Sequence, residues 1–416
     1  MTAGPTAAEV AEAANRLTGI VRRTALEPSN RLSDELGVPV LLKREDLQLC
    51  RSYKVRGAYN AVVALGAEER AHGVVCASAG NHAQGVAFAC AALQIKGRVF
   101  LPASTPRQKR QRIAAIGGPW IEQVISGSTY DDAGAAASAE AARSGAVLIH
   151  PFDDPRTIAG QGSVAVELPE ACDGPIDTVV IPVGGGGLIA GMALWLRQEL
   201  PGTRIVGAEP AGAASMTAAL AAGQPVAVPE LDTFVDGAAV REVGSRAFEI
   251  VRDLVDEVVT VPEGAVCTEM LDLYQSEGII AEPAGALASA AARRYLGGSA
   301  HGPVVCVVSG GNNDVSRYGE IVERSLLHEG LRHYFLVTFP QEPGALRHFL
   351  DVVLSQGEDI VVFEYVKKNN RETGPALVGI ELESAGDLPA LLERMAASPL
   401  TIEQVPPGSP LFTFLL

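Results

Sequence analysis

The alternation of short β-branched runs with alanine-rich segments constrains the fold of this chain most. From Val38 to about Val308, segments of helical periodicity separate the runs VPVLLKRE, GVVCASA, RVFLPA, TVVIPVG, RIVGAE and PVVCVVSGG. Nearly continuous apolar strands indicate burial on both faces, which is typical of a parallel sheet covered by helices. The pattern predicts a doubly wound α/β fold, and a length of 416 residues predicts two domains or more.

The pattern changes after about Arg324. The segments RHYFLVTFP, GALRHFLDVVLSQ, DIVVFEYVKKN, PALVGIELES, DLPALLERMAA and LFTFLL follow one another to the end of the chain. They predict strand, helix, strand, strand, helix and strand, the βαββαβ order of a ferredoxin-like α+β module. We therefore expect a first domain over residues 1–325, with a smaller subdomain at about 55–155, and a separate module over residues 332–416.

The composition argues against nucleic acid and membranes as binding partners. The chain has 33 Lys plus Arg against 49 Asp plus Glu, a net charge of −16, which opposes binding to nucleic acid or to an acidic membrane surface. Its N-terminal segment has no apolar core, and Gly and Pro break its longest apolar runs, so we expect neither signal peptide nor membrane span and a cytoplasmic location. The six cysteines form no close C-x-x-C pair, which argues against disulfides and against a zinc site.

A run of four glycines follows one predicted strand. VVIPVGGGGLIAG places Gly184, Gly185, Gly186 and Gly187 directly before a helix that starts near Leu188. Consecutive glycines let backbone N–H groups point into one concavity, and the helix N-terminus adds positive potential, so the segment predicts a phosphate cup. Neither the G-x-G-x-x-G fingerprint of dinucleotide-binding folds nor the closing Lys-Ser or Lys-Thr of a P-loop is cleanly present.

Three further turns adjoin predicted strands or helices. ASAGNHAQG places Ser78, Asn81 and His82 before a helix, where such residues ordinarily act as caps but would also suit a carboxylate. VVSGGNN ends a strand at Ser309, and AEPAGA opens a helix at Glu282. Because doubly wound folds gather ligands where parallel strands end, we expect these turns to lie near one another.

Lys54 lies just before a predicted helix, in the stretch CRSYKVRGAYN. A lysine among basic neighbours is ordinarily a solvated surface charge. Near a phosphate cup it could instead be a counter-ion, or an amine that forms a Schiff base with a phosphorylated aldehyde such as pyridoxal phosphate, because burial lowers the pKa of an amine. The residues alone leave these alternatives open.

The segments KREDLQLCRSYKVRGAYN, SAGNHAQGVA, GGGGLIAG, EPAGA and VVSGGNN together resemble, in order and over nearly the whole chain, one family of enzymes. These are the fold-type II pyridoxal-phosphate enzymes of tryptophan synthase β-like fold, and specifically the biosynthetic threonine dehydratases, or threonine ammonia-lyases. The resemblance implies that Lys54 is the Schiff-base lysine and Tyr53 its aromatic neighbour. It also implies the remaining contacts of pyridoxal 5'-phosphate: Asn81 to the phenolic oxygen, Ser309 to the pyridine nitrogen, and Gly184, Gly185, Gly186, Gly187 and Leu188 to the phosphate.

The resemblance further implies a reaction. Ser78, Asn81 and His82 would hold the substrate carboxylate, and Lys54 would take the α-proton. A neutral hydroxyl at Ser309 makes the cofactor ring a weaker electron sink than a carboxylate would, which favours loss of a β-hydroxyl. L-Threonine, and L-serine less well, would then be deaminated, and threonine would give 2-oxobutanoate for isoleucine biosynthesis. Alternatives are a serine/threonine dehydratase of broader or catabolic role, and β-replacement or threonine synthesis on the same fold.

Three positions depart from particular members of this family. Ala79 stands where serine racemases carry a second serine, which disfavours racemisation. Ser215 stands where members with a divalent-ion site carry an acid, so we expect no metal and interpret Glu209 as a surface or strand-end carboxylate. Tyr53 stands where many relatives have Phe.

The C-terminal module resembles the single ACT-like regulatory domain of short-form biosynthetic threonine dehydratases. This implies feedback by isoleucine, with valine as a second candidate effector, and the family also implies a homo-oligomer, either dimer or tetramer. PQEPGALRHF resembles the loop, here Pro343 to Leu346, where ACT domains often bind an amino acid; alternatively, Pro-Gly only makes a turn. An alternative of another class is a non-catalytic amino-acid sensor in which this module alone is active.

Overall fold

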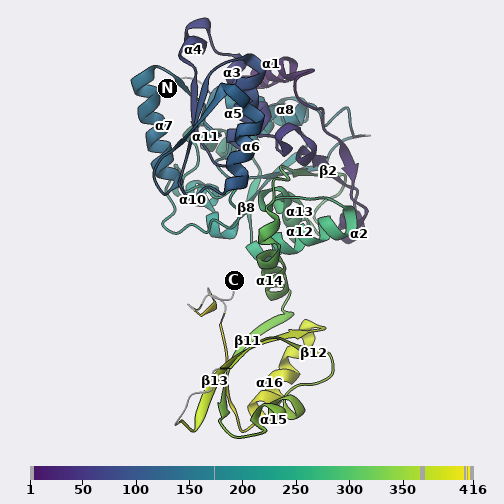
Figure 1. Cartoon of the computed structure of the whole chain (residues 1–416). Helices are drawn as coiled ribbons and strands as arrows, with labels where there is room; N and C mark the ends of the chain where they lie inside the picture. The colour runs from purple at the N-terminus through teal and green to yellow at the C-terminus, as the bar shows by residue number, and fades with distance from the viewer. Residues whose placement is uncertain (1–3, 173, 366–370, 407–408, 410, 413–416) are drawn as a thin grey trace. The chain divides into compact units, whose positions relative to one another are not determined.

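Figure 1 shows the computed structural model of the chain, which describes residues 4–172, 174–365, 371–406, 409 and 411–412. The chain forms two compact units, Met1–Asp314 and Val315–Leu416. This boundary lies before the predicted end of the first domain at residue 325, because α14 (Tyr318–His328) packs on β11 (Arg332–Pro340) of the second unit.

The larger sheet of the first unit has six strands within the described residues, in the order β1-β2-β10-β7-β8-β9. The β1–β2 pair is antiparallel and the other pairs are parallel. The apolar runs TVVIP and VVCVV form β7 and β10, which are buried along their whole length as in sheets covered on both faces. The strand bounds are Leu26–Pro28 (β1), Val40–Arg44 (β2), Thr178–Pro182 (β7), Arg204–Pro210 (β8), Glu257–Val261 (β9) and Val304–Val308 (β10).

Helices cover both faces of this sheet. Val305 and Val307 of β10 join a core with α1, α8, α9 and α11, and because side chains alternate along a strand, the intervening residues face α13 on the other side. The helix bounds are Ala7–Leu17 (α1), Asn30–Leu36 (α2), Pro155–Val166 (α8), Gly187–Glu199 (α9), Ser215–Ala222 (α10), Ser245–Leu254 (α11), Glu263–Glu277 (α12) and Pro283–Tyr295 (α13). The predicted doubly wound α/β architecture is confirmed.

A second, smaller sheet lies within the range expected for the smaller subdomain, with parallel strands in the order β5-β4-β3-β6. Val74 and Cys76 of β3 pack against α3, α5 and α6, whereas Val75 and Ala77 pack against α7, which Figure 1 shows on the opposite side of the sheet. The bounds are Val74–Ala77 (β3), Gly97–Leu101 (β4), Ile121–Ile125 (β5), Val147–Leu148 (β6), Lys54–Val63 (α3), Ala67–His72 (α4), Asn81–Leu93 (α5), Arg107–Gly117 (α6) and Tyr130–Ser144 (α7).

The second unit has the predicted βαββαβ order, in an antiparallel sheet with strand order β12-β13-β11-β14. Phe349 of α15 and Leu391 of α16 pack with Phe335 and Val337 of β11 to form its core. The remaining bounds are Ala345–Val352 (α15), Glu358–Tyr365 (β12), Thr373–Leu382 (β13), Leu388–Ala397 (α16) and Thr401–Gln404 (β14).

The last strand of this unit lies earlier in the chain than the sequence predicted. LFTFLL was the expected strand, but TIEQ forms β14 because its backbone completes the sheet beside β11. Only Ile402 of this strand is apolar, so its sequence signal is weak. Leu411 and Phe412 instead join a small cluster with Tyr334 and Val405, and residues 413–416 lie outside the described residues.

None of the helices in the described parts of the chain combines the length and the apolar character that crossing a membrane requires.

Candidate functional site

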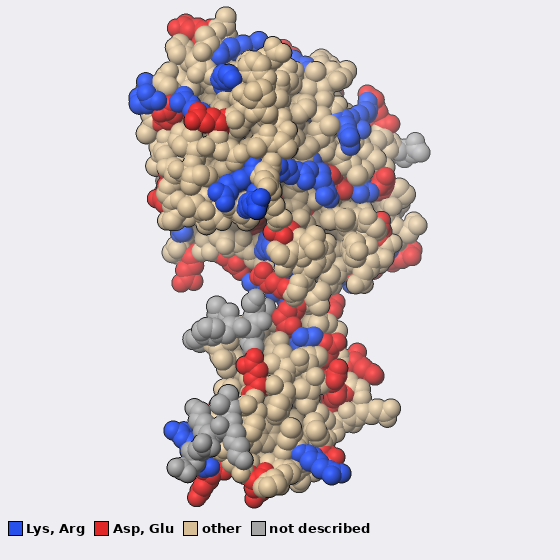
Figure 2. Space-filling model, in the orientation of Figure 1, with Lys and Arg blue, Asp and Glu red and all other residues tan. Residues whose placement is uncertain are grey.

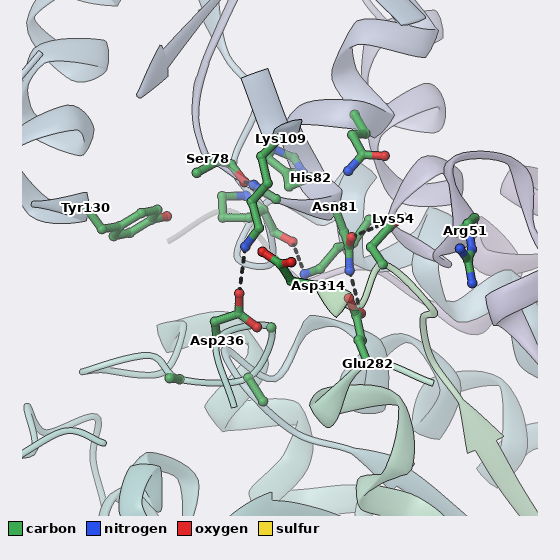
Figure 3. Close-up of a pocket in the computed structure, with 18 of the residues that line it drawn as sticks. Arg51, Lys54, Ser78, Asn81, His82, Lys109, Tyr130, Asp236, Glu282 and Asp314 are labelled. Carbon is green, nitrogen blue, oxygen red and sulfur yellow. Dashed lines mark hydrogen bonds and ion pairs between the residues drawn. The ribbon is translucent and has the colours of Figure 1, made fainter. Parts of the chain in front are cut away.

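The segments that follow β3, β6, β7 and β10 at their carboxyl ends meet around a cavity of about 600 Å³ in the first unit (Figure 3). The start of α3, the first turns of α6 and a loop at residues 233–240 complete its wall. This is the end of a parallel sheet at which doubly wound folds bind ligands. The predicted site residues that line the cavity are Lys54, Ser78, Asn81, His82 and Gly185.

Lys54 is the first residue of α3, and an unusual backbone segment precedes it. Cys50 and Arg51 have φ values of 59° and 53°, in the left-handed region that residues with a side chain rarely adopt. The turn after β10 holds this segment, since the N–H of Gly311 donates to Arg51 O at 3.0 Å. A strained bend, rather than a regular junction, therefore brings the lysine to the cavity.

The amine of Lys54 lies in a site suited to a nucleophile. Its Nζ donates to the carbonyl oxygen of Pro151 at 3.0 Å and lies 5.1 Å from the centre of the Tyr53 ring. Burial lowers the pKa of Lys54 to about 8, although the carboxylate of Glu282 acts in the opposite direction. About a tenth of the amine is thus uncharged at pH 7 and about half at pH 8, and this neutral form is the one that attacks an aldehyde.

Asn81 is the first residue of α5, and its amide is held on both sides. Its Nδ2 donates to Glu282 Oε1 at 2.6 Å, and its Oδ1 accepts from Asn312 Nδ2 at 2.7 Å. Figure 3 shows Asn81 and Glu282 pointing toward one another beside Lys54. Burial raises the pKa of Glu282 to about 7, and the charge of Asp236 adds to this shift. Because an amide nitrogen carries two protons, Asn81 can also donate to an acceptor in the cavity.

The imidazole of His82 is buried and neutral. Its Nε2 lies 2.8 Å from the carbonyl oxygen of Ile149 and must donate to it, whereas Nδ1 is buried and has no partner among the described residues. Burial, together with the charge of Lys54, lowers the pKa of His82 to about 3. A ring in this state cannot donate to a carboxylate, whereas the backbone N–H of His82 in the first turn of α5 can.

Ser78 lies in the turn between β3 and α5, beside the same helix start. Its Oγ accepts from the N–H of Gly80 at 3.2 Å, and the hydroxyl proton remains available to a second partner. Because the first N–H groups of a helix have no partner within the helix, this turn can receive a carboxylate.

The glycine run joins β7 to α9, and neighbouring atoms leave no room for a side chain at its positions. A Cβ on Gly185 would lie 2.2 Å from the ring of Phe152, and one on Gly184 would lie 2.9 Å from the backbone of Ala238. Gly186 has φ = 91° and caps the start of α9 at Gly187. The close packing and the positive φ both require glycine, and the helix N-terminus supplies the potential that favours a phosphate.

The other predicted residues lie outside the cavity wall. Leu188 is part of the core under α9, and the Oγ of Ser309 donates to the carbonyl oxygen of Ala284 at 3.1 Å. Glu209 is buried rather than on the surface, and it accepts from the N–H groups of Met216 and Thr217 at the start of α10. Its place at the end of β8 had suggested exposure, but the first turn of α10 folds back over that end.

Sequence reasoning missed part of the wall. The segment after β6 contributes Pro151 and Phe152, and α6 contributes Lys109, whose Nζ donates to Asp236 Oδ2 at 2.8 Å across the cavity. The available signal for Pro151 and Phe152 was an aromatic between two prolines, in HPFDDP, directly after the short apolar run AVLI. Figure 2 shows Lys and Arg side chains gathered over the part of this unit that contains α6, although the net charge of the chain is −16. This local charge favours an anionic ligand.

The residues present fit pyridoxal phosphate. The cavity has a partly neutral lysine amine for the aldehyde, a glycine cradle at a helix N-terminus for the phosphate, and an amide N–H for the phenolic oxygen. The three groups belong to different elements. A ligand that contacts all of them must therefore carry an aldehyde, a phosphate and a hydrogen-bond acceptor in one molecule.

Comparison with known families agrees with this geometry. Residues 17–310 match the family described as "Pyridoxal-phosphate dependent enzyme", and residues 323–415 match the "C-terminal regulatory domain of Threonine dehydratase". Among solved structures, the processed form of threonine deaminase isoform 2 from Solanum lycopersicum is similar with a TM-score of 0.73 and 38% identity, over 78% of this chain and 96% of that one. Maize serine racemase gives a TM-score of 0.72 at 32% identity, over 78% of this chain and 99% of that one.

Curated relatives extend the similarity to nearly the full length. The biosynthetic L-threonine dehydratase IlvA of Mycobacterium tuberculosis is 58% identical over 411 residues, which are 98% of this chain and 96% of that protein. The Bacillus subtilis enzyme of the same name is 46% identical, over 98% of this chain and 96% of its own. The chain therefore belongs to the pyridoxal-phosphate-dependent enzymes, in the family of the biosynthetic L-threonine dehydratases.

Proposed function

We propose that this chain deaminates L-threonine to 2-oxobutanoate and ammonia, and L-serine less well, with pyridoxal phosphate attached to Lys54. The observation that carries the proposal is the position of the Lys54 amine, whose pKa is lowered to about 8 and which lies in the same cavity as Asn81, Gly185 and the start of α5. The relatives named as L-threonine dehydratases support the choice of substrate.

Pyridoxal phosphate, when bound, supplies an aldehyde that bonds to an amine and a ring that withdraws electrons from the substrate α-carbon. The residues of the chain do the rest. The N-terminal turn of α5 and the Ser78 hydroxyl bind the substrate carboxylate, and Asn81 Nδ2 orients the ring through its phenolic oxygen. Lys54 Nζ would remove the proton from the α-carbon, and that proton would allow the β-hydroxyl to leave as water. Water would then hydrolyse the released enamine to 2-oxobutanoate and ammonia.

Lys54→Ala is the direct test of this function. Wild-type protein supplied with pyridoxal phosphate should absorb visible light and form 2-oxobutanoate from L-threonine, whereas the variant should lose activity by about 10²–10⁴-fold. Lys96→Ala is the matched control, because Lys96 is exposed and its Nζ donates to Pro119 O, away from the cavity. Wild-type protein that neither binds the cofactor nor forms the oxo acid would refute the proposal and favour a non-catalytic sensor.

Racemisation is the competing activity within the fold, since maize serine racemase is a structural neighbour. Ala79 lines the cavity beside Ser78 and has no group that could carry a proton, so this position cannot supply the second acid that racemisation needs. Chiral chromatography of a reaction with L-serine should therefore yield pyruvate and no D-serine.

We propose that the second unit senses isoleucine and that valine competes for the same site. Support comes from the match to a regulatory domain and from the exposed loop Pro343–Leu346, where Gly344 has φ = 97° and begins α15. Regulation requires that the effector bind one state of the enzyme better than another. Isoleucine should therefore raise the threonine concentration needed for half-maximal rate, and valine should reverse part of this shift.

A calorimetric titration of isoleucine into wild-type enzyme and into Leu346→Ala would test the loop, because Leu346 is exposed there. Weaker binding to the variant, with unchanged threonine turnover in the absence of isoleucine, is the expected result. Equal affinities would place the effector elsewhere. We further propose that the chain assembles as a dimer or tetramer, which light scattering of the purified protein would measure.

A further inference from the structure

One side chain links the strained segment before Lys54 to the amide of Asn81. The Nδ2 of Asn312 donates to the backbone oxygen of Cys50 at 2.7 Å and to Asn81 Oδ1, also at 2.7 Å. An amide nitrogen has two protons, so these two bonds use both donors of Asn312. The backbone N–H of Asn312 in addition donates to the carboxylate of Glu282.

The first of these bonds acts on the approach to the lysine. Cys50 and Arg51 have consecutive positive φ values, and such strain persists only where surrounding contacts hold it. Asn312 fixes the carbonyl of Cys50, while the neighbouring Gly311 N–H fixes that of Arg51 at 3.0 Å. Because only Ser52 and Tyr53 separate this bend from the start of α3, its conformation affects where the amine of Lys54 points.

The second bond decides which way the Asn81 amide faces. Since Asn312 donates, the atom of Asn81 turned toward it must be the oxygen, and the Asn81 nitrogen then faces Glu282 Oε1 at 2.6 Å. An Asn81 amide turned over would place its oxygen against the Glu282 carboxylate and its nitrogen against the Asn312 nitrogen. The contact with Asn312 disfavours the turned-over amide whether or not Glu282 is ionised, because two amide nitrogens would then face one another. The N–H groups of Asn81 therefore face Glu282.

We propose that Asn312 is a positioning residue of this enzyme, which sets both the direction of Lys54 and the orientation of the Asn81 amide toward the cofactor. The proposal rests on the function proposed above. It differs from a merely structural role for the turn after β10, because it requires that loss of Asn312 change how pyridoxal phosphate is held even when the protein remains folded.

Asn312→Asp tests this with almost no change of shape. The carboxylate cannot donate to Cys50 O or to Asn81 Oδ1, so Asn81 must turn over or move away. We expect the dissociation constant of pyridoxal phosphate to rise about tenfold or more, the visible band of the bound cofactor to shift, and kcat for threonine to fall more than KM changes. Asn30→Asp is the control for the same amide-to-carboxylate change, because Asn30 is exposed at the start of α2 and does not line the cavity.

A double-mutant cycle on cofactor affinity separates positioning from general destabilisation. If Asn312 acts through Asn81, the double variant Asn81→Ala with Asn312→Ala should bind pyridoxal phosphate no more weakly than the worse single variant. Asn312→Ala introduces no charge and carries the same expectations if Asn312→Asp does not fold. The proposal is overturned if the fold-losses multiply, or if folded Asn312 variants bind the cofactor and turn over threonine within twofold of wild type.

The two proposals fail in different ways. Wild-type protein that binds pyridoxal phosphate but makes no 2-oxobutanoate would refute the function and leave the affinity cycle as the test of Asn312. Wild-type protein that makes the oxo acid, beside Asn312 variants with unchanged affinity and spectrum, would refute the positioning role alone.

Discussion

Arg56 and Glu45 form a two-bonded ion pair that is fully enclosed by the protein. Arg56 Nε donates to Glu45 Oε2 at 2.8 Å and Arg56 Nη2 to Oε1 at 2.7 Å, with side chains 1% and 0% exposed. Burial alone would raise the pKa of Glu45, but the charge of Arg56 holds it below its ordinary value. Arg56 lies two residues after Lys54 in α3, so the pair anchors the helix that carries the reactive amine.

Arg56→Met should be strongly destabilising. It leaves the Glu45 carboxylate buried without its main partner, a change that typically costs about 3–5 kcal/mol of the free energy of unfolding. Denaturant unfolding of the cofactor-free protein measures this. Arg252→Met is the control, because the Arg252–Asp253 pair is 48% and 59% exposed, so solvent screens it and its loss should change the free energy of unfolding little. Equal losses in the two variants would contradict the assignment.

The lowered pKa of Lys54 predicts a pH dependence of cofactor capture. With a pKa of about 8 instead of 10.5, the rate at which cofactor-free enzyme attaches pyridoxal phosphate should rise with pH through a midpoint near 8. Stopped-flow absorbance follows this rate. A midpoint near the ordinary lysine value would show that the amine is solvated.

The same shift affects stability in a defined direction. The unfolded chain keeps the Lys54 proton up to its ordinary pKa, whereas the folded chain releases it at about 8, so stability of the cofactor-free protein should rise with pH between about 8 and 10.5. Below pH 8 the unfavourable buried charge is fully present. Lys54→Met should remove this part of the slope, which unfolding at several pH values would reveal.

Gly185→Ala should weaken binding of pyridoxal phosphate, because the added methyl group would collide with the Phe152 ring beside the glycine run. The added Cβ would lie 2.2 Å from the Phe152 ring, and overpacking of this kind costs about 1–3 kcal/mol. Gly134→Ala in α7 is the matched control, because its Cβ would meet nothing within 4 Å and alanine favours a helix by roughly 0.5–1 kcal/mol. Combining Gly185→Ala with Phe152→Ala should recover part of the lost cofactor affinity; no recovery would argue against the contact as cause.

The imidazole of His82 should remain uncharged at acidic pH. Since burial and Lys54 lower its pKa to about 3, its nitrogen NMR shifts should remain those of one neutral tautomer, protonated at Nε2, from pH 8 down to about 4. His82→Gln identifies the signal by its loss. Titration of this signal near the ordinary value of a histidine would contradict the enclosed position.

Much of the fold was predictable because the burial of parallel strands leaves a strong trace in the sequence. TVVIP and VVCVV must be apolar along their whole length, and each ends in a turn that the next helix requires. The βαββαβ order of the second unit was predictable for a different reason, since its antiparallel strands alternate between more buried and more exposed residues and are separated by amphipathic helices. Its last strand was misplaced because β14 contains only Ile402 as an apolar residue and forms through backbone pairing with β11.

Site residues were predictable where the residue type itself determines the function, as with an amine that can form a Schiff base or a glycine that a phosphate-binding turn requires. Lys54, Asn81 and Gly185 could be named from their segments, and the structure brings them to one cavity. Glu282, Asn312 and Phe152 act through partners that are far away in the sequence, as in the bond of Asn81 to Glu282. Such roles follow from tertiary packing, which a local pattern does not contain.

Asn312 also lies only three residues before Val315, where the second compact unit begins. Three residues of extended chain span at most about 11 Å, so this tether has little slack. A displacement of the backbone at Val315 therefore has few residues over which to relax before it reaches Asn312.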